Sequence, residues 1–138
     1  MTTIDMQTMR YINILDSASK VKTSKCFVYN GTIIFAVPEH LVSKAIGQNA
    51  INIRRIQDKL GKKVRIISEA SGINDAHRFV LDVVNPVRFK SLDIQENMII
   101  INSGNTHNKA SLIGRNKKRL EELSKITEST FNMQLKII

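Results

Sequence analysis

Residues 44–60 read KAIGQNAINIRRIQDKL, an apolar pair followed by a glycine, two polar residues and a helical pattern. Ile53, Ile56 and Leu60 recur at the spacing of one helix face. A glycine between two helical segments lets the main chain turn sharply, because it tolerates backbone angles that other residues avoid. This stretch therefore predicts two helices joined by a tight loop at Gly47.

The same design returns 67 residues later, at Gly114. Residues 113–116 read IGRN where residues 46–49 read IGQN, and apolar helix positions recur at the same offset. Both glycines stand between two helical patterns, and each pattern is followed by a closing strand, which indicates an internal repeat. The 138-residue chain is therefore expected to form two small domains, residues 1–69 and residues 73–138.

The predicted elements follow the same order in both halves. Asn30-Gly31 is a strong hairpin signal between two apolar runs, because both residues tolerate positive φ. The first half is expected to contain a helix ending near 17–19, strands at 25–29 and 32–37, a short helix ending at 46, a helix at 50–60 and a strand at 64–67. The second half is expected to contain a helix at 75–83, strands at 89–94 and 98–102, a short helix ending at 113, a helix at 117–126 and a strand at 131–138. Each half thus has the order α-β-β-α-α-β, and the fold class is α+β.

The first helix is predicted from Met6, Met9, Ile12 and Leu15, which recur at helical spacing. Threonines at positions 2 and 3 can cap it, because a hydroxyl oxygen accepts hydrogen bonds from the N–H groups of the first turn. These four apolar residues are therefore expected to mark the apolar side of this helix.

The chain is strongly basic, with 21 Lys and Arg against 12 Asp and Glu and a net charge of +9. Both halves share the excess: residues 1–70 carry eleven basic and five acidic groups, and residues 71–138 carry ten and seven. Excess positive charge attracts polyanions, of which nucleic acids and acidic membrane surfaces are the usual ones. A solvated basic surface that only keeps the protein soluble is the alternative interpretation.

The sequence offers little for catalysis or metal binding. Cys26 is the single cysteine, so it can form no intramolecular disulfide, and a lone cysteine is not a zinc site. The three histidines are far apart, and no phosphate-binding Gly-Lys-Ser/Thr motif is present. The longest apolar runs, at 33–37 and 98–101, are far too short to span a bilayer, and the N-terminus lacks a signal-peptide pattern. We therefore expect a cytoplasmic protein that is not an enzyme and has no cofactor, no metal and no membrane partner.

Short motifs across nearly the whole chain carry a family resemblance. They are Val37-Pro38, Ala45-Ile46-Gly47, Asn52-Ile53-Arg54-Arg55, Leu60-Gly61-Lys62-Lys63-Val64, Asn85-Pro86-Val87-Arg88, Lys90-Ser91, Leu112-Ile113-Gly114-Arg115-Asn116 and Leu135-Lys136-Ile137-Ile138. With them, the chain resembles the archaeal NusA-like transcription factors, short relatives of the bacterial factor that keep only two KH domains. A KH domain packs two helices, joined by a Gly-x-x-Gly loop, on a three-stranded sheet. The resemblance implies tandem KH domains of type II, whose order is α-β-β-α-α-β.

Each loop departs from the family pattern. The second glycine of the family is replaced by Ala50 in the first loop and by Lys117 in the second. The basic residue usual at the second loop position is Gln48 in the first loop and Arg115 in the second. Ala50 and Lys117 are both good helix formers, so we expect them to occupy the first turn of the helices that follow.

The resemblance implies that these loops bind single-stranded RNA, because a KH loop clamps the backbone of about four unpaired nucleotides. Unpaired N–H groups and the helix dipole favour an anion at the start of the following helix. From residue 109 to residue 119 there are five basic residues and no acidic one, which favours a phosphate nearby. The residues expected to bind RNA are Lys44, Ile46, Gly47, Gln48, Asn49, Ala50, Asn52, Arg54, Lys109, Gly114, Arg115, Asn116, Lys117, Lys118 and Arg119.

The function that the resemblance implies is that of an RNA-binding factor in transcription elongation, termination or antitermination. Its expected partners are single-stranded RNA and either RNA polymerase or a nascent-transcript complex, and the protein is expected to be a monomer. The alternative is a KH-based protein-interaction module that docks on RNA polymerase or the ribosome with weak RNA affinity. The two missing glycines support this alternative.

Overall fold

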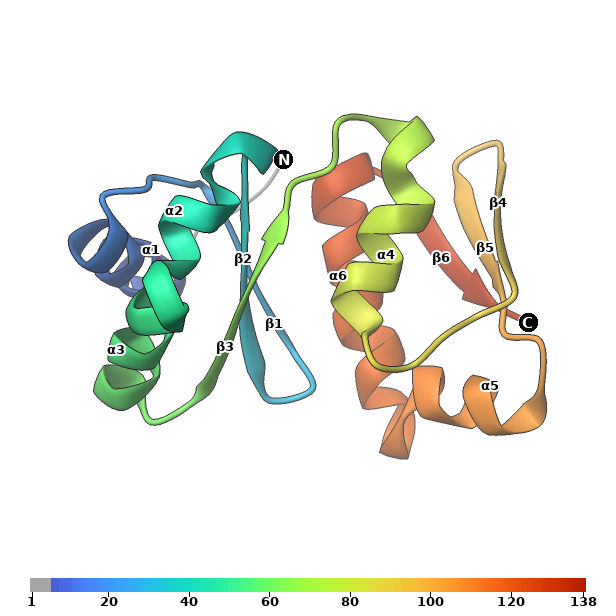
Figure 1. Ribbon diagram of the computed structural model, residues 1–138. Coiled ribbons are helices and arrows are strands. Elements are labelled where there is room, and N and C mark those ends of the chain that lie inside the picture. Colours follow the sequence, from blue (N-terminus) through green and yellow to red (C-terminus); the bar gives the residue numbers. More distant parts are fainter. Residues whose placement is uncertain (1–5) are drawn as a thin grey trace. The chain divides into compact units, whose positions relative to one another are not determined.

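The computed structural model describes residues 6–138, and the chain divides into two compact units, Met1–Glu69 and Ala70–Ile138. The first unit contains α1 (Met6–Ser19), β1 (Lys25–Tyr29), β2 (Thr32–Val37), α2 (Val42–Ile46), α3 (Ile51–Leu60) and β3 (Lys63–Ser68) (Figure 1). The second contains α4 (Ala76–Val84), β4 (Ser91–Gln95), β5 (Met98–Asn102), α5 (Thr106–Ile113), α6 (Lys118–Phe131) and β6 (Gln134–Ile137). Both units therefore have the order α-β-β-α-α-β, an α+β architecture in keeping with a KH-like fold.

Each unit has one three-stranded sheet with its second strand in the centre. In the first unit, β1 pairs antiparallel with β2 across the turn at Asn30-Gly31, whereas β3 pairs parallel with β2. In the second unit, β4, β5 and β6 pair in the same way. A parallel neighbour requires a crossover connection, and here the crossover is a pair of helices, α2–α3 or α5–α6. The loop between these two helices is the one that carries Gly47 or Gly114.

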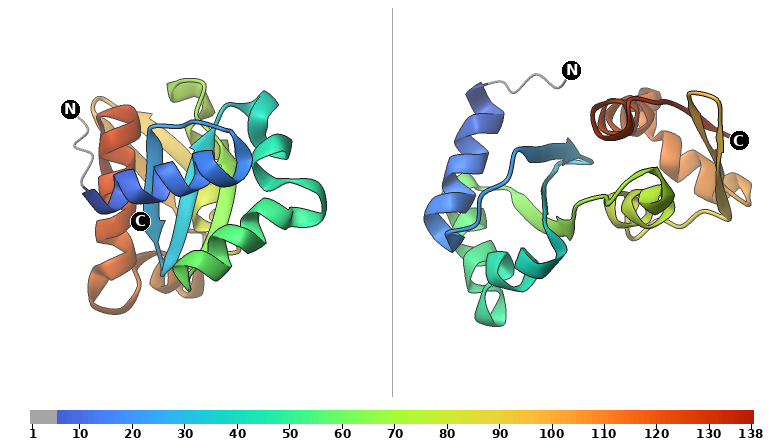
Figure 2. Two further views of the ribbon diagram at one scale, coloured as in Figure 1. Left: turned by 90° about the vertical axis from the view of Figure 1, so that its left-hand side faces the viewer. Right: turned by 90° about the horizontal axis from the view of Figure 1, so that it is seen from above.

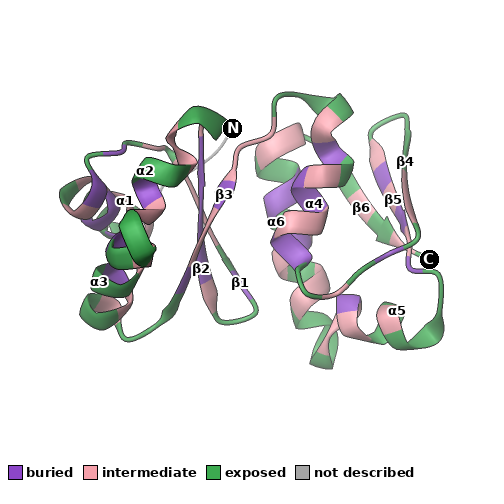
Figure 3. Cartoon of the chain, in the orientation of Figure 1, coloured by how far each residue is buried: buried purple, intermediate pink, exposed green. Residues whose placement is uncertain are grey.

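The helices of the first unit lie on one face of its sheet (Figures 1 and 2). Ile33, Phe35 and Val37 alternate along β2 and form a core with buried residues of the helices, among them Leu15 and Ile56. Figure 3 colours the buried parts of β2 and of the helices purple. Alternate residues of a strand point to the same face, so one run of β2 supplies the centre of this core. The helical hairpin thus packs on a rigid apolar support.

The apolar face of α1 agrees with the prediction at Leu15 and differs from it at the two methionines. Tyr11, Ile14 and Leu15 are its buried apolar residues, whereas the side chains of Met6 and Met9 are 87% and 52% exposed. Residues at positions i, i+3 and i+4 share one helix face, so Tyr11, Ile14 and Leu15 form a stripe just as consistent with a helix as the predicted one. The predicted caps at positions 2 and 3 lie outside the described residues.

The second unit corrects two predicted boundaries. Helix α6 continues to Phe131, where the prediction ended it at 126 and began the last strand at 131. Phe131 packs edge-to-face on Phe79 of α4, with ring centroids 5.7 Å apart, and Thr127 is fully buried. The helix ends at Asn132, whose φ of 57° is left-handed. Strand β4 begins at Ser91, two residues later than predicted.

A cluster of charged residues holds the segment that enters α4. The carboxylate of Asp75 accepts hydrogen bonds from the backbone N–H of Ser71 and from Nε of Arg78, each at 3.1 Å. Arg78 also pairs with Asp82 at 2.7 Å. The hydrogen bond from Arg78, together with that from Ser71, lowers the pKa of Asp75 to about 2. The guanidinium in turn has its pKa raised by Asp75.

No helix within residues 6–138 has both the length and the apolar character needed to cross a membrane.

The charged cluster of Asp75, Arg78 and Asp82 predicts that the stability of the protein depends on pH. Because folding lowers the pKa of Asp75 from 3.8, its contribution is fully present above pH 4 and is lost as the pH falls through about 2. Asp75→Asn should therefore lower the free energy of unfolding at pH 7 and make it fall less steeply between pH 4 and pH 2. Thermal unfolding followed by circular dichroism would measure both effects. Asp93→Asn, at an exposed position of β4, is the matched control, and equal slopes in the two variants would contradict the assignment.

Candidate nucleic-acid interface

The loop between α2 and α3 is a four-residue turn dominated by left-handed conformations. Gly47 has φ 80° and ψ 164°, Asn49 has φ 56° and ψ 30°, and Ala50 has φ 58° and ψ 31°. The backbone N–H of Ala50 donates to the carbonyl of Gly47 at 3.1 Å, and the N–H of Gly47 donates to the carbonyl of Ser43 at 3.0 Å. These bonds close the turn and reverse the chain between the two helices.

The loop between α5 and α6 repeats this geometry. Gly114 has φ 76° and ψ 173°, Asn116 has φ 56° and ψ 29°, and Lys117 has φ 60° and ψ 22°. The N–H of Lys117 donates to the carbonyl of Gly114 at 3.2 Å, as Ala50 does to Gly47. The two loops therefore have the same backbone conformation despite their different side chains.

The structure contradicts the expectation that Ala50 and Lys117 begin the following helices. Both residues are left-handed and precede the first helical residue, Ile51 or Lys118. Helix propensity is a weak preference, and the geometry of the chain reversal overrides it. A residue with a β-carbon in this region costs about 1–2 kcal/mol relative to the right-handed helix. The two loops thus form the same turn with Ala50 or Lys117 as its last residue.

The first residue of each loop has to be glycine. A β-carbon at Gly47 would lie 2.8 Å from Nδ2 of Asn52 and 2.9 Å from Cγ2 of Ile51. At Gly114 it would lie 2.8 Å from Cγ of Arg119 and 3.1 Å from the backbone nitrogen of the same residue. The start of the following helix therefore packs directly against the glycine, which also needs its positive φ.

One hydrogen bond ties the two helices together beneath each loop. In the first unit, Nδ2 of Asn52 donates to the carbonyl of Lys44 at 3.1 Å. In the second, Nη1 of Arg119 donates to the carbonyl of Ser111 at 3.0 Å. Each donor lies five residues after the glycine and each carbonyl lies three before it, in the last turn of a helix where carbonyls lack intrahelical partners. We name this contact the loop tie.

The loop tie gives two of the predicted residues, Asn52 and Arg119, a structural role. The Asn52 side chain is buried, with the residue 9% exposed, so it supports the first loop from beneath rather than facing solvent. Arg119 is half-buried and directs its guanidinium at the helix that precedes the loop. The prediction placed both among the RNA contacts and missed the tie. The signal for the tie is a side chain with an N–H donor, Asn52 or Arg119, at the same offset from both glycines.

The other predicted residues gather around their two loops. Those of the second unit are mostly cationic and exposed, and no acidic residue occurs between positions 109 and 119. Glu121 is the first acidic residue beyond them, in the first turn of α6. Exposed residues of this group are Lys109, Arg115, Asn116, Lys117 and Lys118, with Gly114 half-buried among them. The second loop is therefore a basic surface on a closed turn.

The first loop has a different surface. Gln48 and Asn49 are exposed and uncharged, and Ile51 follows with 41% of its surface exposed. Arg54 is exposed, and its guanidinium donates to the carbonyl of Asn49 within the loop. The remaining predicted residues of this unit are Lys44, which is exposed, and Ile46, Gly47 and Ala50, which are half-buried.

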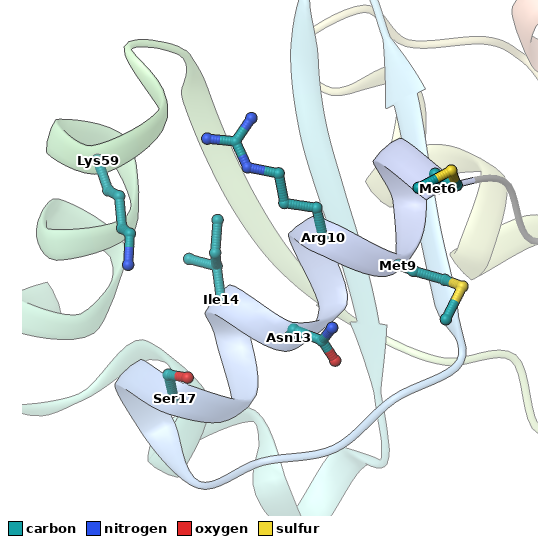
Figure 4. Close-up of a pocket in the computed structure, with 7 residues that line it drawn as sticks. All are labelled: Met6, Met9, Arg10, Asn13, Ile14, Ser17 and Lys59. Atoms are coloured by element: carbon teal, nitrogen blue, oxygen red, sulfur yellow. The ribbon is translucent and has the colours of Figure 1, made fainter.

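A hollow of about 480 Å³ in the first unit is lined by residues of α1 and by one residue of α3, and none of them belongs to the loop at Gly47 (Figure 4). It is lined by Met6, Met9, Arg10, Asn13, Ile14, Ser17 and Lys59, none of which was predicted to bind RNA. Within residues 6–138, no three His, Cys, Asp or Glu side chains are grouped so that they could hold a metal ion.

The left-handed alanine predicts a stabilising substitution. Ala50→Gly should raise the free energy of unfolding by about 0.5–1 kcal/mol, because relief of the left-handed strain exceeds the entropy that a glycine adds to the unfolded chain. Urea denaturation would measure the change. The control is Ala110→Gly at an exposed position of α5, which should lower stability by about 0.5–1 kcal/mol. A loss of stability in both variants would contradict the loop conformation.

The comparisons with known proteins agree with this architecture. No family model matches the chain. Its sequence is 21% identical over 133 residues to a Halococcus morrhuae protein described as "Probable transcription termination protein NusA", covering 95% of this chain and 94% of that protein. The crystal structure of APE1850 matches with a TM-score of 0.69 at 24% sequence identity, over 98% of this chain and 100% of that one. Over nearly its whole length the chain is thus similar in sequence to a protein described as a probable NusA, and its fold is similar to that of a solved structure.

Proposed function

We propose that the chain binds single-stranded RNA through two tandem type II KH domains, residues 1–69 and residues 73–138. The observation that carries this proposal is the second loop. Arg115, Lys117 and Lys118 are exposed on a closed turn at the start of α6, with no acidic residue between positions 109 and 119. Positive side chains at a helix N-terminus are repelled by one another and by the positive end of the helix dipole. An anion bound there offsets both repulsions. A phosphate of an RNA backbone is the anion that a KH-like loop accommodates.

The role that we propose is that of a NusA-type factor in transcription elongation, termination or antitermination. The similarity to a protein described as a probable transcription termination protein supports this role, because it extends over 95% of the chain. The net charge of +9 fits a partner that carries many phosphates. In this role the protein would act in the cytoplasm as a monomer on a nascent transcript or on RNA polymerase, without a cofactor and without catalysis.

The first loop favours a second candidate function. Its turn residues carry no charge, and neither loop has the second glycine of the family pattern. A KH-based module that docks on RNA polymerase or the ribosome, with weak RNA affinity, would need no phosphate contact there. RNA affinity separates the two candidates.

Reversal of the loop charges should weaken RNA binding. In Arg115→Glu/Lys117→Glu/Lys118→Glu, fewer phosphates are neutralised and fewer counterions are released. The negative slope of log affinity against log salt should therefore become shallower by about 2. Fluorescence anisotropy with a labelled single-stranded RNA at several salt concentrations would measure affinity and slope together.

The control for this variant is Arg88→Glu/Lys125→Glu/Lys136→Glu, which makes the same change in net charge at exposed positions of the same unit outside the loop. It should keep most of the wild-type affinity. Equal losses in the two triple variants would show that only overall charge matters, and binding unchanged by loop reversal would refute the site.

Single-stranded RNA should bind more tightly than double-stranded DNA of the same length. A narrow loop that contacts unpaired nucleotides cannot reach bases that are stacked and paired, whereas general charge attraction does not distinguish the two. Competition of unlabelled duplex DNA and single-stranded RNA for the labelled RNA would measure the preference. Equal competition would support attraction by charge alone.

A further inference from the structure

The two loops have nearly identical backbones but side chains of opposite character. Residues 48, 50 and 51 are Gln, Ala and Ile, whereas the equivalent residues 115, 117 and 118 are Arg, Lys and Lys. Corresponding φ and ψ values at the glycine, the asparagine and the left-handed residue that ends each loop differ by 9° at most. Because the main chain presents the same groups in both loops, any difference in their ligands has to come from these side chains.

We propose that the two loops contact different parts of one RNA strand, the second loop its phosphates and the first loop its bases. This inference rests on the proposed function and extends it by assigning Ile51 and Gln48 as base-contacting residues. The positive charge that contacts phosphates comes from the loop of the second unit.

Ile51 is the side chain that carries the assignment. It is 41% exposed, although isoleucine is among the residues most often buried. Its Cγ2 lies 2.9 Å from the position that a β-carbon on Gly47 would occupy. The Ile51 side chain is therefore next to the first residue of the loop. An exposed aliphatic group has neither a charge nor a hydrogen-bond donor with which to bind a phosphate, but it can pack on the apolar face of an unstacked base.

The amide side chains next to it complete the chemistry. Gln48 and Asn49 are exposed, and each amide offers both donors and an acceptor, the groups that pair with base edges. Arg54, the nearest cation in α3, directs its guanidinium back to the carbonyl of Asn49. Because residues 48–51 carry no charge, these turn residues can hold a base by packing and hydrogen bonds, and Lys44 is the exposed cation that flanks them.

This division of roles has a thermodynamic signature. Contacts to phosphates release counterions, so they give affinity that falls steeply with salt. Contacts to bases release no counterions, so their loss lowers affinity equally at all salt concentrations. The two loops can therefore be tested separately by the salt slope.

The experiment measures binding of the full chain to a labelled random-sequence single-stranded RNA of roughly 20 nucleotides between about 50 and 200 mM salt. Ile51→Ala should weaken binding roughly 3- to 10-fold at every salt concentration with an unchanged slope, and Gln48→Ala should act in the same direction. The exchange Arg115→Gln/Lys117→Ala/Lys118→Ile, which gives the second loop the side chains of the first, should instead flatten the slope by about 2. Since Ile51 and Gln48 are exposed, thermal unfolding should be unchanged in their variants.

A second arm uses an RNA of the same length that contains abasic nucleotides throughout. The wild-type protein and Ile51→Ala should bind this abasic RNA equally, because it lacks the bases on which Ile51 would pack. A weakening by Ile51→Ala that persists on abasic RNA would overturn the base contact.

The outcomes separate this inference from the proposed function. If Ile51→Ala and Gln48→Ala bind like wild type while the exchanged second loop binds weakly, the inference is wrong and the chain remains an RNA-binding protein. If the exchanged second loop also binds like wild type, the proposed function fails with it.

Discussion

The constraint on which each unit depends is the parallel pairing of its last strand. Strands β3 and β6 run parallel to the centre of their sheets, so the chain has to return along the sheet before it can pair. The return consists of two helices, and a four-residue turn has to reverse the chain between them. Only a residue without a β-carbon fits at the start of that turn, because a β-carbon there would lie about 3 Å from atoms of the next helix. The position of the loop thus follows from the topology of the sheet.

The loop tie explains how the same turn persists with different residues on it. In one unit an asparagine and in the other an arginine bonds a carbonyl of the preceding helix, from the same place in the sequence. The tie uses a main-chain acceptor, so it does not depend on which side chains occupy the turn. Left-handed strain at Ala50 and Lys117 is therefore held by the closure of the turn and the packing of the glycine rather than by residue preference.

Much of the fold could be predicted from local patterns. The strands 25–29, 32–37 and 98–102 agree with β1, β2 and β5, because apolar runs bounded by turn residues mark strands within a few residues. Repetition of the glycine placed both loops between helices. These features depend on neighbours in the sequence, which a pattern can represent.

The features that the sequence did not predict depend on contacts between distant residues. Helix α6 extends to Phe131 because that ring packs on Phe79, 52 positions earlier. The buried stripe of α1 could not be distinguished from the methionine stripe, since both have helical spacing. For the candidate site, the cluster of cations was evident, whereas the conformation of Lys117 and the burial of Asn52 follow from the closed turn. Because the tie ends on a main-chain carbonyl, one hairpin backbone is compatible with neutral residues at positions 48, 50 and 51 and with cations at the equivalent positions 115, 117 and 118, so the surface charge of the turn can vary without a change of architecture.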